Sequence, residues 1–352
     1  MKPSRPLTIS AVTVVLLVFL AAPVSAAESP VPTKNEPAVK NELPNVAILA
    51  TGATIASKGV RALSLTDYGV GAEQKPVGVQ QLIDAVPEIQ KFANIREEQV
   101  FNIGSSELSI KDWLKLGKRV NELLKDPELD GIVITHGTDT LEEPAYFLNF
   151  VTKSNKPIVL VASMRPATEL SADGALNLVN AVASAADKAS KDKGVLVIIN
   201  DNFSPLFGAT KTNSTNAATF KCPDTGYLGY MQNNVPYFVS TPDKKYTVNS
   251  EFEVSALEDL PGVDVKYVVL VSDGNLVEAM VVNGAKGIIN AGIGHANMPN
   301  GVNKSLATAV KQGAAVVAAS RVGSGLITPL GKFTKEGYVT AMMHNPQKPE
   351  SS

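Results

Sequence analysis

Seven short apolar segments recur along the chain, and their spacing constrains the fold more than any other feature. The segments are residues 45–50, 131–135, 157–162, 194–199, 265–271, 287–291 and 314–319. Runs of this length that are apolar throughout are typical of strands buried on both faces of a parallel sheet. Residues 141–152 and 173–188, which lie between such runs, carry apolar side chains at helical spacing, and Ser171 or Asp173 can cap the second helix. The alternation predicts an α/β fold, whose ligands bind where strands end in loops.

The alternation is interrupted once, over a polar stretch that runs from residue 203 to residue 261 and contains Pro236, Pro242 and Pro261. A chain of 352 residues also exceeds the usual size of a single core. We therefore predict two domains. A larger N-terminal α/β domain over residues 44–240 has a mostly parallel sheet flanked by helices, and a linker over 241–261 leads to a smaller C-terminal α/β domain over 262–352.

The first 27 residues have the pattern of a secretory signal peptide. Lys2 and Arg5 precede an apolar run over residues 9–22, and Val24-Ser25-Ala26 offers a small-residue cleavage site. An uncleaved membrane anchor is the alternative, but the run is shorter than the roughly 20 residues that a bilayer requires. Residues 28–43 are polar and proline-rich, which predicts a flexible leader. We expect a periplasmic or secreted protein with no membrane contact after cleavage.

Charge and composition exclude several classes of partner. The net charge of −2 becomes −4 when Lys2 and Arg5 leave with the signal, and no basic run remains, so nucleic acids and anionic membranes are poor partners. A single cysteine, Cys222, excludes an internal disulfide. The three histidines lie far apart in the sequence without a nearby histidine or cysteine, so we expect no zinc site.

Two hydroxyl-rich segments follow predicted strands. Thr51-Gly52-Ala53-Thr54-Ile55-Ala56 comes after the first, and Thr135-His136-Gly137-Thr138-Asp139-Thr140 comes after a later one, with Glu142 and Glu143 in the next helical turn, where the helix dipole favours acids. Asp139 taken alone could equally be a helix cap. Both segments can line one crevice of the sheet. A nucleotide-binding protein is disfavoured, because residues 52–59 lack the second glycine and the Lys-Ser/Thr pair of a phosphate loop.

These segments carry a specific resemblance. Residues 48–56 resemble the first active-site signature of the bacterial type II (periplasmic) L-asparaginases and glutaminase-asparaginases, and residues 131–143 resemble the second. Further motifs follow in family order, so that the resemblance covers residues 44–348. They are Asn102-Ile103-Gly104-Ser105, Met164-Arg165-Pro166, Ser171-Ala172-Asp173-Gly174, Lys211-Thr212-Asn213 and Asn345-Pro346-Gln347-Lys348.

The resemblance implies an amidohydrolase that converts L-asparagine to L-aspartate and ammonia, with L-glutamine as a further substrate, and that needs no metal or organic cofactor. By this resemblance Thr54 is the nucleophile and Tyr68 lies beside it on a mobile loop. Thr138, Asp139 and Lys211 resemble the second catalytic cluster, in which lysine and aspartate polarise a threonine. A threonine hydroxyl is a weak nucleophile at neutral pH, so such a proton chain is chemically necessary.

Substrate binding is expected from the same two strand ends. Ser105 matches a position that holds the α-carboxylate of the substrate, and Asp139, beside Thr138, matches one that holds the α-ammonium. Ser106 stands where a glutamine commonly contacts the carboxylate. Backbone N–H groups of the two loops are the natural donors to a tetrahedral oxyanion.

Further positions depart from the family pattern, and those at Val271 and Lys332 motivate a second interpretation. Ala53 replaces a usual glycine, which matters only if the backbone there needs a positive φ. The family takes an asparagine and an acid from a neighbouring subunit, but Val271 and the stretch 323–332, which ends at Lys332, supply neither. The family's terminal helix is also missing after residue 348, so the expected homo-oligomer, a dimer of dimers, would be less stable. The alternative is a catalytically weakened member that binds an amino acid without efficient turnover.

Overall fold

The computed structural model describes residues 42–59, 61–63, 77–242 and 244–348. The predicted signal peptide (1–27), almost all of the predicted leader (28–43) and Tyr68 lie outside the described residues. Within the described ranges, none of the helices combines the length and the apolar character that crossing a membrane requires.

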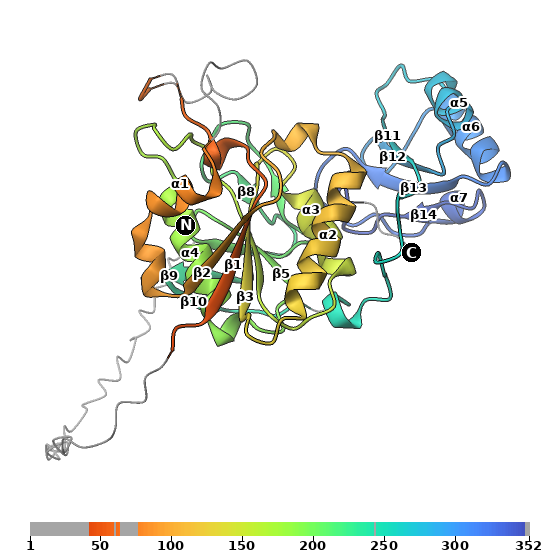
Figure 1. Cartoon of the computed structure of the whole chain (residues 1–352). Helices are drawn as coiled ribbons and strands as arrows, with labels where there is room; N and C mark the ends of the chain where they lie inside the picture. The colour runs from red at the N-terminus through yellow and green to blue at the C-terminus, as the bar shows by residue number, and fades with distance from the viewer. Residues whose placement is uncertain (1–41, 60, 64–76, 243, 349–352) are drawn as a thin grey trace, which may run out of the picture. The chain divides into compact units, whose positions relative to one another are not determined.

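Among the described residues, eight strands form the larger sheet (Figure 1). They are β1 (Asn45–Ala50), β2 (Asn94–Gln99), β3 (Gly131–Thr135), β4 (Ile158–Val161), β5 (Val195–Ile199), β6 (Asn202–Ser204), β9 (Gly229–Gln232) and β10 (Val235–Phe238). Their order is β10-β9-β6-β5-β4-β3-β1-β2. Strands β2, β1, β3, β4 and β5 run parallel, and β6, β9 and β10 add an antiparallel edge. The predicted mostly parallel sheet is confirmed.

Helices cover both faces of this sheet (Figure 1). Helices α2 (Ile110–Leu124) and α3 (Glu142–Val151) pack against the alternate strand residues that include Ala47 and Leu49. Helices α1 (Val79–Asp84) and α4 (Gly174–Ala186) pack against the opposite set, which includes Val46 and Ile48. Since successive side chains of a strand point to opposite faces, a strand buried on both sides must be apolar throughout. This requirement explains the continuous apolar runs of the sequence.

Strand β2 was not predicted, and its position in the sheet explains why. Its sequence, NIREEQ, is mostly polar, and β2 lies at the edge of the sheet beside β1 alone. Ile95 and Glu98, which point to opposite faces, are partly covered, while the remaining side chains of β2 are exposed. An edge strand of this kind carries no apolar run, so backbone pairing with β1 defines it.

The prediction that Ser171 or Asp173 caps α4 through its side chain is wrong. Asp173 occupies the position before the helix, but its side chain makes no capping hydrogen bond. Its carboxylate instead accepts hydrogen bonds from the backbone N–H groups of Met164 (3.0 Å) and Arg165 (2.9 Å). The loop after β4 therefore competes successfully for the carboxylate.

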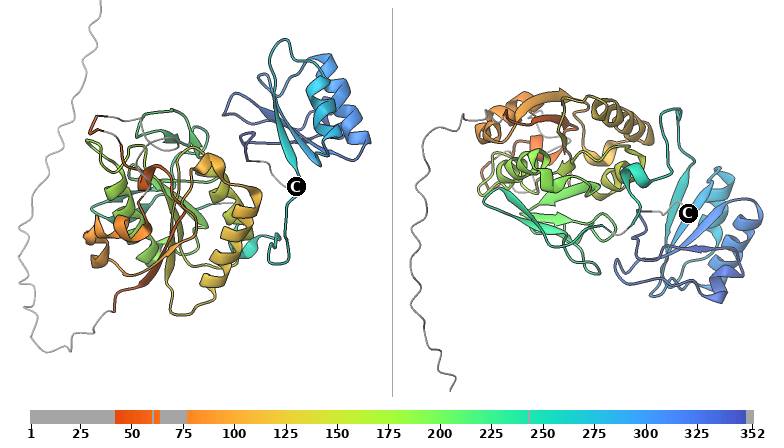
Figure 2. Two further views of the ribbon diagram at one scale, coloured as in Figure 1. Left: turned by 45° about the horizontal axis from the view of Figure 1, so that its top comes forward. Right: turned by 90° about the horizontal axis from the view of Figure 1, so that it is seen from below.

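A second, smaller parallel sheet follows, which confirms the predicted C-terminal α/β architecture. Its strands lie in the order β11 (Val263–Tyr267), β12 (Gly287–Gly292), β13 (Ala315–Ser320) and β14 (Val339–Thr340). Helices α5 (Asn275–Val282) and α6 (Asn300–Lys311) pack side by side on it (Figure 2). A short helix, α7 (Gly331–Thr334), precedes β14. The domain boundaries at residues 240 and 262 stay predictions.

The strand predicted over residues 265–271 is wrong in its limits, because β11 ends at Tyr267. Ser272 turns the chain: its backbone N–H donates to the carbonyl of Val269, and its hydroxyl accepts from the N–H of Val269. Leu270 and Val271 therefore lie in an exposed turn. Because both residues are apolar, their sequence resembles the end of a buried strand.

Close packing of α4 on β3 leads to a stability prediction. An ideal Cβ at Gly131 would lie 2.2 Å from the carbonyl oxygen of Ala185, whereas one at Gly301 in α6 would meet nothing closer than 3.8 Å. We expect Gly131→Ala to lower the free energy of unfolding by about 1–3 kcal/mol, since backbone must move to admit the methyl group. Gly301→Ala should be neutral or stabilising by up to about 1 kcal/mol. Urea unfolding of both variants checks the contrast, which equal effects would contradict.

Candidate active site

The order of the parallel strands places a topological switch point between β1 and β3, and we refer to the region outside these two strand ends as the crevice. The chain crosses from β1 outward to β2, and from β3 in the other direction to β4, so the connections diverge at this point. Open α/β sheets with the strand order 2-1-3-4-5 bind ligands at such a switch point, outside the carboxyl ends of the strands. Both hydroxyl-rich segments follow these two strands. The sheet therefore brings the predicted site residues to one place.

The two strand ends are fastened together by the carbonyl of Thr135. It accepts hydrogen bonds from the backbone N–H of Thr51 (3.1 Å) and from its hydroxyl (2.9 Å). A third segment joins them from the sequence after β2. Gly52 has φ 102° and lies so close to Ile103 that an ideal Cβ would be 2.7 Å from its nitrogen. Only glycine satisfies both the backbone conformation and this close approach.

Ala53 adopts a backbone conformation that is reserved almost entirely for glycine, with φ 67° and ψ −158°. The sequence left open whether this position needs a positive φ, and the structure shows that it does. Residues in this region carry about 1–3 kcal/mol of strain. Ala53 directly precedes the short 3₁₀ turn Thr54–Ala56, so the strained residue sets the direction in which Thr54 leaves the strand.

Ala53 also contacts the second loop. An ideal Cβ at Gly137 would lie 2.7 Å from Cβ of Ala53 and 2.5 Å from Oγ of Ser105. Ser105 is buried, and its carbonyl accepts a hydrogen bond from the hydroxyl of Thr140 (3.2 Å). The predicted substrate residue Ser105 therefore lies between the loops that carry Thr54 and Thr138. Ser106, in contrast, is exposed.

Lys211 joins the second loop from far along the chain. It lies on β7 (Thr210–Lys211), which pairs with β8 (Phe220–Lys221) in a small two-stranded sheet. Its Nζ donates to Oγ1 of Thr138 (3.1 Å) and to Oδ1 of Asp139 (2.5 Å). Thr138, Asp139 and Lys211 were predicted as one cluster, and the structure brings them together.

The ion pair between Lys211 and Asp139 orients the two side chains but adds little to the free energy of unfolding. The Asp139 side chain is 70% exposed and that of Lys211 is 16% exposed, so solvent screens their attraction. Asp139 does not cap α3, which begins at Glu142 and has Leu141 before it without a side-chain capping bond. The carboxylate is therefore available to bind Lys211.

The hydrogen bonds of Glu142 were not predicted from the sequence. Glu142 was predicted only as an acid near the start of a helix, but its buried carboxylate accepts hydrogen bonds from three directions. The donors are the Thr210 hydroxyl (3.1 Å), the Lys211 backbone N–H (3.3 Å) and the Gln347 side-chain amide (2.9 Å). These donors lie up to 205 positions away in the sequence, so no local pattern could have found them.

Burial shifts the pKa of two further groups close to the second loop. Burial lowers the pKa of His136 to about 4, so its ring is neutral at pH 7 and its Nδ1 bonds to the carbonyl of Gly137. Burial, followed by the nearby charge of Glu142, raises the pKa of Glu143 to about 7. In the part of the chain that the structure describes, no group of three or more His, Cys, Asp or Glu residues could hold a metal ion.

Val271 and Lys332, which depart from the family pattern, lie outside this cluster of contacts. The side chain of Val271 is 86% exposed in the turn after β11. Lys332 lies in α7, and its Nζ donates to Oδ1 of Asn297 (2.5 Å).

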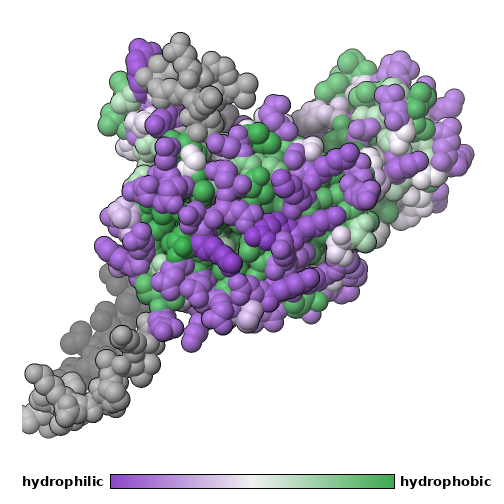
Figure 3. Space-filling view, viewed as in Figure 1, coloured by the Kyte–Doolittle hydropathy of each residue, from purple (hydrophilic) through white to green (hydrophobic). Residues whose placement is uncertain are grey.

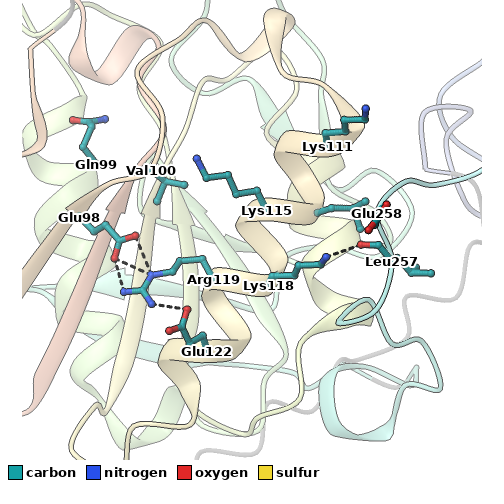
Figure 4. A pocket seen from close by; sticks show the side chains of 11 residues that line it. Glu98, Gln99, Val100, Lys111, Lys115, Lys118, Arg119, Glu122, Leu257 and Glu258 are labelled. Carbon is teal, nitrogen blue, oxygen red and sulfur yellow. Dashed lines mark hydrogen bonds and ion pairs between the residues drawn. The ribbon is translucent and has the colours of Figure 1, made fainter.

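A separate hollow of about 450 Å³ lies between β2, α2 and the segment that contains Leu257 (Figure 4). It is rich in charge, and several of these charged side chains already bind groups of the protein. Arg119 binds Glu98 (2.8 Å) and Glu122 (2.7 Å), and Lys118 donates to the carbonyl of Leu257 (2.6 Å). This face of the molecule is mostly hydrophilic, with apolar residues scattered over it (Figure 3). The hollow contains none of the strand-end hydroxyls, so we place the candidate site in the crevice.

The strain at Ala53 leads to a test by substitution. We expect Ala53→Gly to raise the free energy of unfolding by about 1 kcal/mol, because relief of strain exceeds the added entropy of the unfolded chain. Ala167, which is exposed and has an ordinary φ, is the matched control. Ala167→Gly should lower the free energy of unfolding by about 0.5–1 kcal/mol. Thermal unfolding that shows the same sign for both variants would refute strain at Ala53.

Comparisons with known proteins agree with this geometry. Residues 45–243 match the family model described as "Asparaginase, N-terminal", and residues 262–349 match "Glutaminase/Asparaginase C-terminal domain". The chain is 46% identical over 308 residues to L-asparaginase 2 of Escherichia coli (strain K12), which covers 87% of this chain and 86% of the relative. It is 41% identical over 336 residues to glutaminase-asparaginase of Pseudomonas fluorescens biotype A, with coverage of 95% and 90%.

A solved structure has the same fold. The crystal structure of the probable cytoplasmic L-asparaginase from Campylobacter jejuni superposes with a TM-score of 0.83 at 42% identity, and covers 87% of this chain and 92% of that one. This similarity contradicts the prediction of a periplasmic or secreted protein, which is wrong. That prediction rested on residues 1–27, outside the described residues.

The family assignment rests on the whole described fold. The two family models cover both sheets, and the predicted signatures lie at the ends of β1 and β3 inside the first match. The chain therefore belongs to the asparaginase family of amide hydrolases.

Proposed function

We propose that this protein hydrolyses L-asparagine to L-aspartate and ammonia through Thr54 as the nucleophile, and that L-glutamine is a second substrate, hydrolysed to L-glutamate. The observation that carries the proposal is the junction of three segments. The loop with Thr54 contacts the loop with Thr138 through Ala53 and Gly137, and Lys211 binds both Thr138 and Asp139. A nucleophile and a proton-transfer cluster then share one crevice.

The hydrogen bonds of Thr138 suggest how protons move. A lysine ammonium group can only donate, so the Thr138 oxygen accepts from Lys211 and its own proton points elsewhere. This arrangement prepares the Thr138 hydroxyl to pass a proton on. We propose that it receives the proton of Thr54, directly or through water, and delivers it to the departing amide nitrogen.

The chemical steps then balance without a cofactor. The Thr54 oxygen attacks the side-chain amide carbon, and backbone N–H groups of the two loops stabilise the oxyanion. The C–N bond breaks, ammonia leaves with the transferred proton, and an ester with Thr54 remains. Water hydrolyses this ester, which yields aspartate and restores the hydroxyl group. Tyr68, outside the described residues, is proposed to act beside Thr54.

Substrate orientation is assigned to the rim of the crevice. We propose that Ser105 and Ser106 bind the α-carboxylate, Ser105 from its buried position and Ser106 from the surface. The exposed carboxylate of Asp139, with the neighbouring Thr138, receives the α-ammonium group. Asp139 also binds Lys211, so the same side chain would take part in substrate binding and in proton transfer.

The nucleophile is tested by ammonia release from L-asparagine and L-glutamine. Thr54→Ala should lower kcat by about 10³-fold or more for both substrates, since the covalent intermediate cannot form. Thr54→Ser keeps a hydroxyl and should retain measurable turnover. Circular dichroism and unfolding temperature establish that both variants fold. Undiminished turnover by Thr54→Ala would refute the assignment, and an inactive but folded parent that still binds an amino acid would support the weakened family member instead.

We also propose a homotetramer built as a dimer of dimers. Leu270, Val271 and Val282 are each about 85% exposed, and a partner copy would remove such apolar side chains from water. Light scattering at micromolar concentration should give four times the chain mass. A stable monomer would contradict the proposal.

A further inference from the structure

The last described residues are buried rather than free in solvent. His344, Asn345 and Lys348 are all at most 9% exposed. The His344 ring packs against Tyr146 of α3 and Phe207, with ring centroids 5.5 Å and 5.1 Å away. The segment that follows the second sheet therefore ends against the helix and the loop that lead to the catalytic cluster.

Lys348 fixes the loop that leads into β7. Its side chain is 1% exposed, and Nζ donates to the carbonyls of Leu206 (3.0 Å) and Ala209. Burial lowers the pKa of Lys348 to about 8, although Glu142 and Glu143 oppose this shift. A buried lysine is unfavourable without such partners. Ala209 immediately precedes Thr210 in the chain, and Leu206 lies at the start of the same loop.

Gln347 reaches the same strand through Glu142. Its amide donates to Oε1 of Glu142 (2.9 Å), the oxygen that also accepts from the Thr210 hydroxyl (3.1 Å). The other oxygen, Oε2, accepts from the backbone N–H of Lys211 (3.3 Å). Glu142 begins α3, directly after the loop that holds Thr138 and Asp139. One carboxylate thus connects both segments whose side chains meet in the site.

We propose that Glu142, held in place by Gln347, is a positioning residue for Lys211. It sets the β7 backbone so that Nζ reaches Thr138 and Asp139. The inference rests on the proposed function, because it assumes that Lys211 acts in the proton chain. A displacement of about 1 Å in a group that must transfer a proton can lower turnover by about 100-fold. The C-terminal segment is thereby part of the apparatus that arranges the reaction.

The first test uses the Thr210 hydroxyl, which can be removed at nearly constant shape. In Thr210→Val the hydrogen bond to Glu142 is lost, and we expect kcat for L-asparagine to fall about tenfold while KM changes less than twofold. Thr210→Ser restores the hydroxyl and should restore most of kcat. Thr212→Val is the matched control, since the Thr212 hydroxyl bonds to the Thr219 carbonyl within the same hairpin (2.7 Å) and not to Glu142.

An equal loss of kcat in Thr212→Val would show that any loosening of the hairpin suffices, and this would overturn the proposal. A rise in KM at unchanged kcat for Thr210→Val would do the same. Failure of Thr210→Ser to recover turnover would show that the hydroxyl is not the relevant group.

The second test asks whether Gln347 acts through Lys211. Gln347→Leu, Lys211→Met and the double variant are compared by kcat. Gln347→Leu should lower kcat about five- to tenfold in the parent and by less than twofold in the Lys211→Met background, because a misplaced lysine matters only where a lysine is present. Equal losses in both backgrounds would refute positioning of Lys211.

The failure of this inference is distinguishable from failure of the proposed function. If Lys211→Met leaves kcat unchanged, Lys211 is not part of the proton chain, and the positioning role of Glu142 falls with that step, whereas hydrolysis through Thr54 is decided separately by Thr54→Ala. If Lys211→Met lowers kcat by about 100-fold while Gln347→Leu and Thr210→Val leave it unchanged, the proposed function stands and only the positioning role of Glu142 is refuted.

Discussion

The pairing of β1 with β3 is the constraint on which the site depends. Parallel register sets Ala50 beside Thr135, so the next residues of both strands leave the sheet together. The carbonyl of Thr135 then fastens Thr51 through two hydrogen bonds. From this anchor follow the close contact of Ala53 with Gly137 and the burial of Ser105 between them. The glycine at 137 is required by space, and its loop presents Thr138 to the crevice.

Local strain and burial at this junction have one physical origin. Three backbone segments converge where the sheet ends, and few side chains fit between them. Gly52 adopts a positive φ without strain because it has no side chain, whereas Ala53 is held at a positive φ by its surroundings. Residues in such conformations persist only where neighbouring structure determines them. The conformation of the first turn after β1 is therefore determined by the segments that surround it.

A buried group of charges supports the other side of the crevice. Glu142 collects donors from β7 and from the C-terminal segment, and Lys348 closes the loop before β7. Buried charges are tolerated here because each has several hydrogen-bond partners. Apolar side chains in the same place would stabilise the fold about as well. The network of buried charges and hydrogen bonds instead defines one arrangement of segments that lie far apart in sequence. The network therefore determines the position of Lys211 more than it raises the free energy of unfolding.

The sequence by itself determined the α/β class, the two-domain architecture and the strand ends at which the candidate site lies. Continuous apolar runs are required of strands covered on both faces, so six of the seven predicted segments coincide with strands to within a residue or so. The edge strand β2 and the exposed turn at Val271 departed from the pattern, because edge strands and turns are not selected by burial. Thr138 and Asp139 could be located because they follow a strand directly.

The tertiary structure decided which of these residues meet. Lys211 lies 73 positions from Thr138, and its place in the site was inferred only by resemblance to a family. The position of Glu142 between Lys211 and Gln347, and the positive φ of Ala53, were not contained in any local pattern. Such contacts depend on the order of strands in the sheet and on the path of the chain between them. Sequence periodicity reports the burial of each segment, whereas only the assembled sheet fixes which segments become neighbours.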